Sequence, residues 1–226
     1  MNTYSILIPI HNEIRYIEPL LEELEYYSCI GHEIIIIDDG SDDGSGKALN
    51  AQKGIVLISL PKNVGKGYAL REGLAKASND RIIVYDGDME LDPADISKLM
   101  LLDRSEQKKF IMGYRFKSIN PLKSNFDWGN FMFTSFFNII FKTNHKDILC
   151  CAKAFYLSDL KGCHLSASCF DIDVELASIL TVRNKNTKVD QIYIEYNRRS
   201  VEDGKKLKVS DGWKILIKII KMARYL

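Results

Sequence analysis

Residues 34–45 read IIIIDDGSDDGS, a β-branched run that stops at paired aspartates followed by glycine and serine. Four consecutive isoleucines favour a strand that is buried on both faces, because no polar residue interrupts the run. The same pattern recurs at residues 4–13, YSILIPIHNE, and at residues 81–90, RIIVYDGDME. Apolar residues with helical spacing separate these runs, at residues 13–27 and 67–77. The alternation predicts an α/β fold, with a mostly parallel central sheet and helices on both faces.

Further elements are expected along the whole chain. Strands are predicted at residues 55–60, 110–113, 151–156 and 188–196. Helices are predicted at residues 47–52, 93–102, 128–141, 170–181 and 209–225. No internal repeat, low-complexity tract or Pro- or Gly-rich linker divides the sequence. We therefore expect a single domain over residues 1–226.

The composition is that of an ordinary globular protein. The chain has 226 residues, of which 46% are hydrophobic and 27% charged, and this argues against disorder. Its longest stretch without a charged residue, residues 128–141, is shorter than the roughly 20 apolar residues of a spanning helix. No transmembrane helix and no signal peptide are therefore expected. Five cysteines without a CxxC pair favour a reduced, cytosolic compartment and no thiolate zinc site.

Charge is unevenly distributed, although the net charge is only +1. Residues 1–100 carry 17 acidic and 9 basic side chains, whereas residues 198–226 carry 9 basic and 3 acidic ones. An acidic first half suits a metal site, and a basic tail suits phosphate or an anionic membrane surface. A solvated helix face is an equally good interpretation of the tail.

Polar residues follow three of the predicted strands, and ligands of open α/β sheets bind outside the carboxyl ends of the strands. Asp86, Asp88 and Glu90 alternate after one strand, so that their carboxylates can converge on Mg²⁺ or Mn²⁺. Such an ion neutralises a leaving diphosphate. A polar turn before a helix would account for the same residues. Asp39 is placed to accept from a base or a ribose hydroxyl, although Asp is also a good turn former.

The segment NVGKG at residues 63–67 precedes a predicted helix. Glycine lets the backbone approach a ligand closely, and the N-terminus of a helix favours anions. By itself this glycine-containing loop is a weak signal, because such loops are common.

Taken together and in order, four segments resemble the inverting family 2 glycosyltransferases of the A-type fold. They are IPIHNE (8–13), IIIIDDGSDDGS (34–45), NVGKGYALREGL (63–74) and YDGDMELDP (85–93). Four later segments are similar to the dolichyl-phosphate mannose or glucose synthase branch. They are MGYRF (112–116), DILCCAKAF (147–155), FDIDVEL (170–176) and IEYNRRSVEDGKKL (194–207). The resemblance implies a Rossmann-like, nucleotide-sugar-binding half at residues 1–113 and an acceptor-binding half at residues 114–226.

The resemblance also implies a role for each matching residue. Nucleotide-sugar binding is expected from Pro9, His11, Glu13, Asp39, Gly65, Lys66 and Asp86. Metal binding is expected from Asp86, Asp88 and Glu90. Catalytic roles are expected from Asp88, Arg115, Asp173, Arg199 and Lys206.

The expected acceptor decides which of these groups matter most. A phosphate is already ionised at pH 7, so its glycosylation requires cations rather than a strong base. Arg115, Arg199 and Lys206 match positions that would hold such a phosphate, although surface charges would look the same in the sequence. Asp173 is either a contact to acceptor or sugar or a helix cap. On a helix, Asp171 and Glu175 share a face from which Asp173 points away.

Two segments of the second half are amphipathic. Residues 126–141 hold seven aromatic residues and a polar stripe, Asn130, Thr134 and Asn138, which fits a membrane interface, a lipid groove or an aromatic core. In the tail, Lys214, Lys218, Lys221 and Arg224 are expected on one helix side, opposite Ile215, Leu216, Ile219 and Ile220. Such a helix suits an anionic cytoplasmic leaflet, although lysines around a packed helix would give the same pattern.

We therefore predict a metal-dependent inverting glycosyltransferase that uses Mg²⁺ or Mn²⁺. It would move a sugar from a UDP- or GDP-linked donor to a polyprenyl phosphate in cell-envelope glycan biosynthesis. A cytoplasmic location, with peripheral association at the inner membrane face and no nucleic-acid partner, is expected. The alternatives are transfer to a saccharide hydroxyl and a non-catalytic nucleotide-sugar-binding scaffold.

Overall fold

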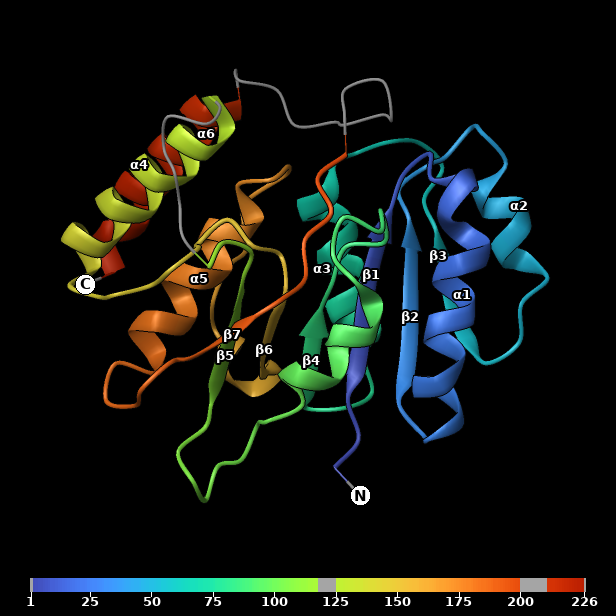
Figure 1. Ribbon diagram of the computed structural model, residues 1–226, viewed down its shortest axis with the longest axis horizontal. Helices are drawn as coiled ribbons and strands as arrows, with labels where there is room; N and C mark the ends of the chain where they lie inside the picture. The colour runs from blue at the N-terminus through green and yellow to red at the C-terminus, as the bar shows by residue number, and fades with distance from the viewer. Residues whose placement is uncertain (1, 118–124, 200–210, 226) are drawn as a thin grey trace.

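The computed structural model describes residues 2–117, 125–199 and 211–225, and a single twisted sheet organises them (Figure 1). Within this part of the chain the sheet has seven strands in the order β3-β2-β1-β4-β6-β5-β7. The strands are β1 (Ser5–Ile10), β2 (Glu33–Asp38), β3 (Ile55–Ser59), β4 (Arg81–Val84), β5 (Phe110–Tyr114), β6 (Lys153–Tyr156) and β7 (Asp190–Tyr193).

The sheet is mostly parallel, as predicted. Strand β1 pairs in parallel with β2 and β4, β2 with β3, and β5 with β7, whereas β6 runs antiparallel to both of its neighbours. The carboxyl ends of β1, β2, β4 and β5 therefore lie at one edge of the sheet. Strand order reverses beside β1, which is where an open α/β sheet offers a crevice for a ligand.

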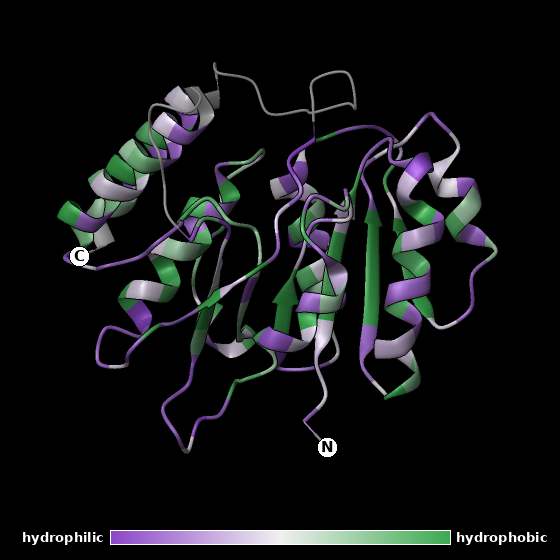
Figure 2. Cartoon of the chain, viewed as in Figure 1, coloured by the Kyte–Doolittle hydropathy of each residue, from purple (hydrophilic) through white to green (hydrophobic). Residues whose placement is uncertain are grey.

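Helices cover both faces of the sheet, which confirms the predicted layers. One face packs against α1 (Ile14–Cys29), α2 (Ser45–Asn50) and the 3₁₀ helix η1 (Pro93–Leu99). The other packs against α3 (Lys66–Lys76), α4 (Asn125–Phe141), α5 (Ile172–Arg183) and α6 (Asp211–Met222). Two short 3₁₀ segments, η2 (Leu157–Leu160) and η3 (Ala223–Tyr225), complete the elements. Figure 2 shows β2 and β4 hydrophobic over most of their length, as burial on both faces requires.

Two predicted elements differ in the structure. The helix expected at residues 93–102 is the shorter 3₁₀ helix η1. The Tyr27 hydroxyl lies 2.9 and 3.0 Å from the carbonyl oxygens of Pro93 and Ala94, and it competes for these acceptors with the N–H groups that would continue an α-helix. The strand expected at residues 188–196 ends at Tyr193. Beyond it the chain turns to pair with residues 90–92, where Asp92 N–H donates to the Glu195 carbonyl at 3.3 Å.

Helices α4 and α6 pack side by side at one end of the sheet (Figure 1). The polar stripe of α4 faces inward, where Asn130 and Thr134 are buried. Its outer side is apolar, with Trp128 51% and Ile139 76% exposed. No helix in the described ranges combines the length and apolar character needed to cross a membrane.

The predicted basic face of the tail helix is wrong at Lys218. This side chain is buried, and its Nζ lies 3.0 Å from Glu175 Oε1 and 3.4 Å from Asp171 Oδ2. The carboxylates of Asp171, just before α5, and Glu175, on α5, require a cation opposite them, so α6 turns Lys218 inward and leaves Ile220 51% exposed. The shared face of Asp171 and Glu175 is confirmed by this contact.

Candidate active site

A cavity of about 360 Å³ lies outside the carboxyl ends of the parallel strands. It is lined by every predicted site residue that the structure describes, namely Pro9, His11, Glu13, Asp39, Gly65, Lys66, Asp86, Asp88, Glu90, Arg115, Asp173 and Arg199. Lys206 lies outside the described residues. The cavity therefore brings both halves of the chain together at one edge of the sheet.

The end of β2 is tied to the loop that begins α3. Both carboxylate oxygens of Asp39 accept backbone N–H groups, from Val64 at 2.8 Å and from Gly65 at 2.9 Å. Gly65 has a φ of +98°, and a Cβ there would collide with the carbonyl oxygen of Ser168. Asp39 thus fixes the loop that precedes α3 beside the cavity. Nucleoside binding by Asp39 stays a prediction.

The end of β4 carries a surplus of negative charge. Asp88 is partly buried, and this burial together with the nearby Asp86 carboxylate raises its pKa to about 7. Glu90 and Glu13 add further negative charge around it. Carboxylate oxygens crowded in this way suit a hard divalent cation, which would relieve their repulsion. The chemistry of this donor set therefore fits Mg²⁺ or Mn²⁺.

The same carboxylates are engaged by basic groups of the protein. Arg199 donates to Glu13 Oε2 at 2.8 Å and to the Asp88 carbonyl oxygen at 3.1 Å, and its backbone N–H donates to Glu90 Oε1 at 3.1 Å. Across the described ranges, no three His, Cys, Asp or Glu side chains are grouped to hold a metal ion. Metal binding by Asp86, Asp88 and Glu90 therefore stays a prediction.

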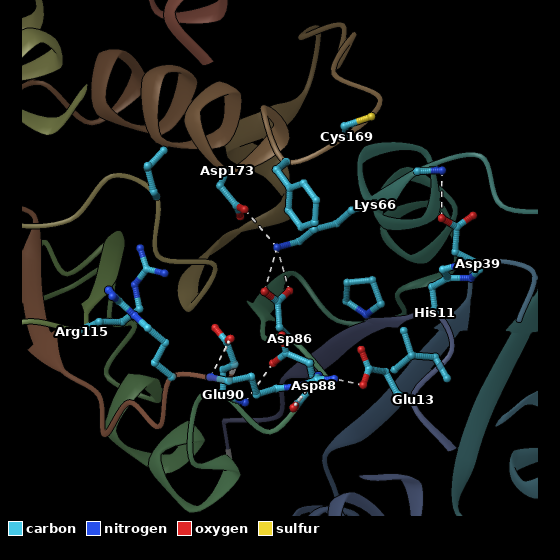
Figure 3. Close-up of a pocket in the computed structure, with 18 of the residues that line it drawn as sticks. His11, Glu13, Asp39, Lys66, Asp86, Asp88, Glu90, Arg115, Cys169 and Asp173 are labelled. Atoms are coloured by element: carbon cyan, nitrogen blue, oxygen red, sulfur yellow. Dashed lines mark hydrogen bonds and ion pairs between the residues drawn. The ribbon is translucent and has the colours of Figure 1, made fainter. Parts of the chain in front are cut away.

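Lys66 lies across the cavity floor between two acids (Figure 3). Its Nζ lies 2.7 Å from Asp86 Oδ1 and 3.0 Å from Asp173 Oδ2. Burial lowers the pKa of Lys66, but the two carboxylates outweigh it and raise that pKa well above its ordinary value. Lys66 is thus a cation that links the segment after β4 to the first turn of α5.

Asp173 also faces a second lysine. Lys153 is fully buried on β6, and its Nζ lies 3.9 Å from Asp173 Oδ1 while donating to the carbonyl of Cys150. Asp173 is therefore arranged as an ion-pair partner rather than as a free base.

Arg115 follows β5 and lies at the opposite end of the cavity. Its guanidinium donates to both oxygens of Asp147, at 2.8 and 3.0 Å, and Asn130 of α4 donates to Asp147 Oδ1 at 3.0 Å. Burial raises the pKa of Asp147, but the Arg115 charge outweighs it and lowers that pKa. The rings of Phe116 and Tyr196 lie within 5.4 Å of the guanidinium. Arg115 is therefore a pre-oriented cation in the cavity wall.

Arg198 is a cavity residue that the sequence analysis missed. It pairs with Asp127 on α4, and its NH1 donates to Asp127 Oδ2 at 3.3 Å. Arg115 and Arg198 thus both lie beside α4, on the side of the cavity away from Asp39. The sequence around Arg198 gave no signal for this position, because Asp127 is 71 residues away along the chain.

A model of the glycosyl transferase family 2 matches residues 5–162. The chain belongs to this family. The match includes the ends of β1, β2, β4 and β5, from which the cavity is built. Family 2 membership was predicted from the motifs, and the match confirms it.

Individual relatives agree with this assignment. The chain is 33% identical over 109 residues, 44% of its length, to an undecaprenyl-phosphate 4-deoxy-4-formamido-L-arabinose transferase from Proteus mirabilis. It spans about a third of that relative's length. It is 24% identical over 251 residues to a dolichyl-phosphate beta-glucosyltransferase from Trichomonas vaginalis, covering 97% of this chain and 72% of the relative.

Solved structures confirm the A-type fold. A glucosyl-3-phosphoglycerate synthase from Mycobacterium tuberculosis, in complex with Mn²⁺, UDP and glucosyl-3-phosphoglycerate, superposes with a TM-score of 0.77. The superposition covers 99% of this chain and 80% of that one at 16% identity. At this identity the likeness concerns the fold.

Proposed function

We propose that this protein is a metal-dependent inverting glycosyltransferase that moves a sugar from a nucleotide-diphosphate sugar to a polyprenyl phosphate. One observation carries the proposal: a single cavity has carboxylates at the β4 end and two arginines, Arg115 and Arg198, at the α4 end. The acidic end suits a cation with a diphosphate, and the basic end suits a second anion.

The donor would bind over the ends of β1, β2 and β4. Pro9, His11, Glu13, Asp39 and Gly65 line this part of the cavity. Asp86, Asp88 and Glu90 would hold the divalent cation, which when bound supplies positive charge to the leaving diphosphate. A structurally similar synthase was solved in complex with Mn²⁺ and UDP, which supports a divalent cation and a nucleotide as ligands of this fold.

The acceptor would bind on the side of α4. A phosphate monoester is ionised at pH 7, so it attacks without a base but needs neighbouring cations. Arg115 is fixed for this purpose by Asp147, and Asp173 is already engaged by Lys66. Relatives named for undecaprenyl phosphate and dolichyl phosphate support a lipid phosphate as the acceptor.

A membrane surface would present this acceptor. The outer sides of α4, α6 and η3 combine exposed apolar side chains, including Trp128 and Trp213, with the exposed bases Lys214, Lys221 and Arg224. Tryptophan and basic residues together favour the interface of an anionic leaflet. Asn130 of α4 and Ile215 of α6, on the inner sides of the same two helices, line the cavity, so the acceptor side lies behind the proposed membrane face. We infer peripheral association with the cytoplasmic leaflet.

The test is sugar transfer to a short-chain polyprenyl phosphate, compared with a panel of oligosaccharides, using UDP- and GDP-sugars with Mn²⁺ or Mg²⁺. Arg115→Gln should reduce kcat/KM for the lipid phosphate about 10- to 150-fold, because one charge-assisted contact contributes roughly 1.5–3 kcal/mol. Asp173→Asn should retain measurable transfer.

Two other outcomes would change the assignment. Transfer to a saccharide hydroxyl alone, with Asp173→Asn inactive and Arg115→Gln nearly normal, would favour a polysaccharide or glycan acceptor. Donor binding without transfer or hydrolysis would favour a non-catalytic nucleotide-sugar-binding protein.

A further inference from the structure

Four charged side chains form an alternating row across the cavity floor. Asp86, Lys66, Asp173 and Lys153 follow one another at 2.7, 3.0 and 3.9 Å between neighbouring charged atoms. Lys153 is fully buried, and the side chains of Lys66 and Asp173 are only 10% and 5% exposed. The row begins at the proposed metal ligands and ends inside the sheet, so it joins the donor half to the acceptor half.

Lys66 occupies the side of the Asp86 carboxylate at which a metal ion would bind. Its Nζ reaches both carboxylate oxygens of Asp86, Oδ1 at 2.7 Å and Oδ2 at 3.0 Å. An ammonium group and a divalent cation cannot occupy the same position between these oxygens, because they repel one another.

A donor diphosphate offers Lys66 a different partner. Lys66 is the first residue of α3, and the positive end of the helix dipole favours an incoming anion. Its four-carbon stem is flexible, so Nζ can leave Asp86 for a phosphate oxygen without a backbone movement. Asp173, backed by Lys153, remains in place as the second partner of Lys66.

We propose that Lys66 is an exchangeable counter-ion of Asp86: in the donor-free protein it blocks the metal position, and on donor binding it passes to the diphosphate. The inference rests on the proposed metal-dependent function. It assigns Lys66 the role of coupling metal binding to donor binding, in addition to contacting the donor. Because coupling is reciprocal, UDP and Mn²⁺ should each tighten the binding of the other.

The test is a titration of the donor-free protein with Mn²⁺ alone, in which free Mn²⁺ is followed by electron paramagnetic resonance. Lys66→Gln should bind Mn²⁺ roughly 10- to 100-fold more tightly than the wild type, because Asp86 is released from its ion pair. Lys62→Gln removes the same charge from an exposed position in the same loop and should leave the affinity unchanged. Equal or weaker binding by Lys66→Gln would overturn the inference.

Two further measurements make the result specific. The Asp173→Asn variant keeps Lys66, which then still pairs with the Asp86 carboxylate. The Mn²⁺ affinity of this variant without donor should therefore not rise. A rise equal to that of Lys66→Gln would mean general loosening of the site and would contradict the exchange. In the presence of UDP, the gain in Mn²⁺ affinity should be smaller for Lys66→Gln than for the wild type. Melting curves of the variants, together with a second substitution, Lys66→Met, show whether a change in Mn²⁺ affinity comes from loss of the fold.

The failure of this inference and that of the proposed function can be told apart. Tight Mn²⁺ binding with UDP by the wild type, together with identical donor-free affinities of wild type and Lys66→Gln, refutes only the exchange. Absence of Mn²⁺ binding by every variant, even with UDP present, refutes the metal-dependent function as well.

Discussion

Asp88 lies among three other carboxylates, those of Asp86, Glu90 and Glu13, and its pKa of about 7 reflects burial first and their repulsion second. Asp88→Asn keeps the volume and removes the charge. We expect loss of sugar transfer, because a metal ligand is gone, together with an unchanged or higher melting temperature at pH 8, because repulsion is relieved. Transfer assays and thermal melts check both parts.

A variant that keeps full turnover after EDTA treatment and Mg²⁺ restoration would contradict a ligand role for Asp88. A strongly lowered melting temperature would contradict the repulsion argument. The two outcomes are independent, since the first concerns the bound cation and the second concerns the protein without it.

Site residues that lie just after a predicted strand could be identified from the sequence. Asp39, Asp86 and Asp88 each follow an apolar run, and parallel strands bring such positions together. Arg198 was missed, because its partner Asp127 is 71 residues away in the sequence. The ion pairs of Lys66 were equally hidden, since its partner Asp173 is 107 residues away.

At the scale of single elements, α6 separates two kinds of lysine. Lys214 and Lys221 are exposed with Arg224, whereas Lys218 is paired with α5. The triple change Lys214→Gln, Lys221→Gln, Arg224→Gln should weaken binding to anionic vesicles roughly 100-fold at low salt. The reason is that each base near such a surface contributes about 1 kcal/mol. Co-sedimentation measures the effect.

A matched control removes three exposed lysines that belong to neither α4 nor α6, namely Lys53, Lys62 and Lys76. This control should bind vesicles almost as the wild type does. Equal losses in both triple variants would indicate non-specific attraction, and no vesicle binding by the wild type would end the peripheral-membrane proposal.

Lys218→Gln should act on stability instead. The side chain neutralises Glu175, whose carboxylate also accepts N–H groups from Ser166 and Ala167. Breaking such a buried pair costs about 3–5 kcal/mol, because one charge is left without its partner. Urea denaturation should register the loss, and a cost below about 1 kcal/mol would mean that the pair is dispensable.

The element pattern was predictable for strands and less so for amphipathic helices. Uninterrupted β-branched runs such as IIII at 34–37 have one reasonable placement, in the middle of a sheet. The tail helix has apolar residues on more than one side, so periodicity alone left the direction of Lys218 open. Its direction is set by Asp171 and Glu175 at the start of α5, a tertiary contact that the sequence of α6 does not contain.

For the molecule as a whole, a buried histidine predicts a pH dependence of stability. Burial, assisted by the charge of Lys153, lowers the pKa of His145 to about 4. The unfolded chain binds a proton there near pH 6.5, whereas the folded protein stays neutral until about pH 4. Between these values the unfolded state holds more protons, so the free energy of unfolding falls as the pH falls, by about 3 kcal/mol in total.

His145→Gln removes this titration. Urea denaturation of both proteins at pH 7 and pH 4.5 should show a larger loss for the wild type, and contributions of other groups cancel in the comparison. The same pH dependence in both proteins would refute the assignment to His145, which lies 3.0 Å from Thr181 Oγ1 in the core.

The central claim, glycosylation of a phosphate in the cavity between the β4 carboxylates and Arg115, is tested most directly by the product. Phosphorus NMR of the wild-type protein with a nucleotide sugar, Mg²⁺ and a short-chain polyprenyl phosphate follows the acceptor phosphorus itself. The account predicts that its monoester signal is replaced by a sugar phosphodiester of inverted anomeric configuration, in step with release of the nucleoside diphosphate. An unchanged monoester signal while nucleoside diphosphate is released, or a sugar attached to a hydroxyl group instead, would contradict it.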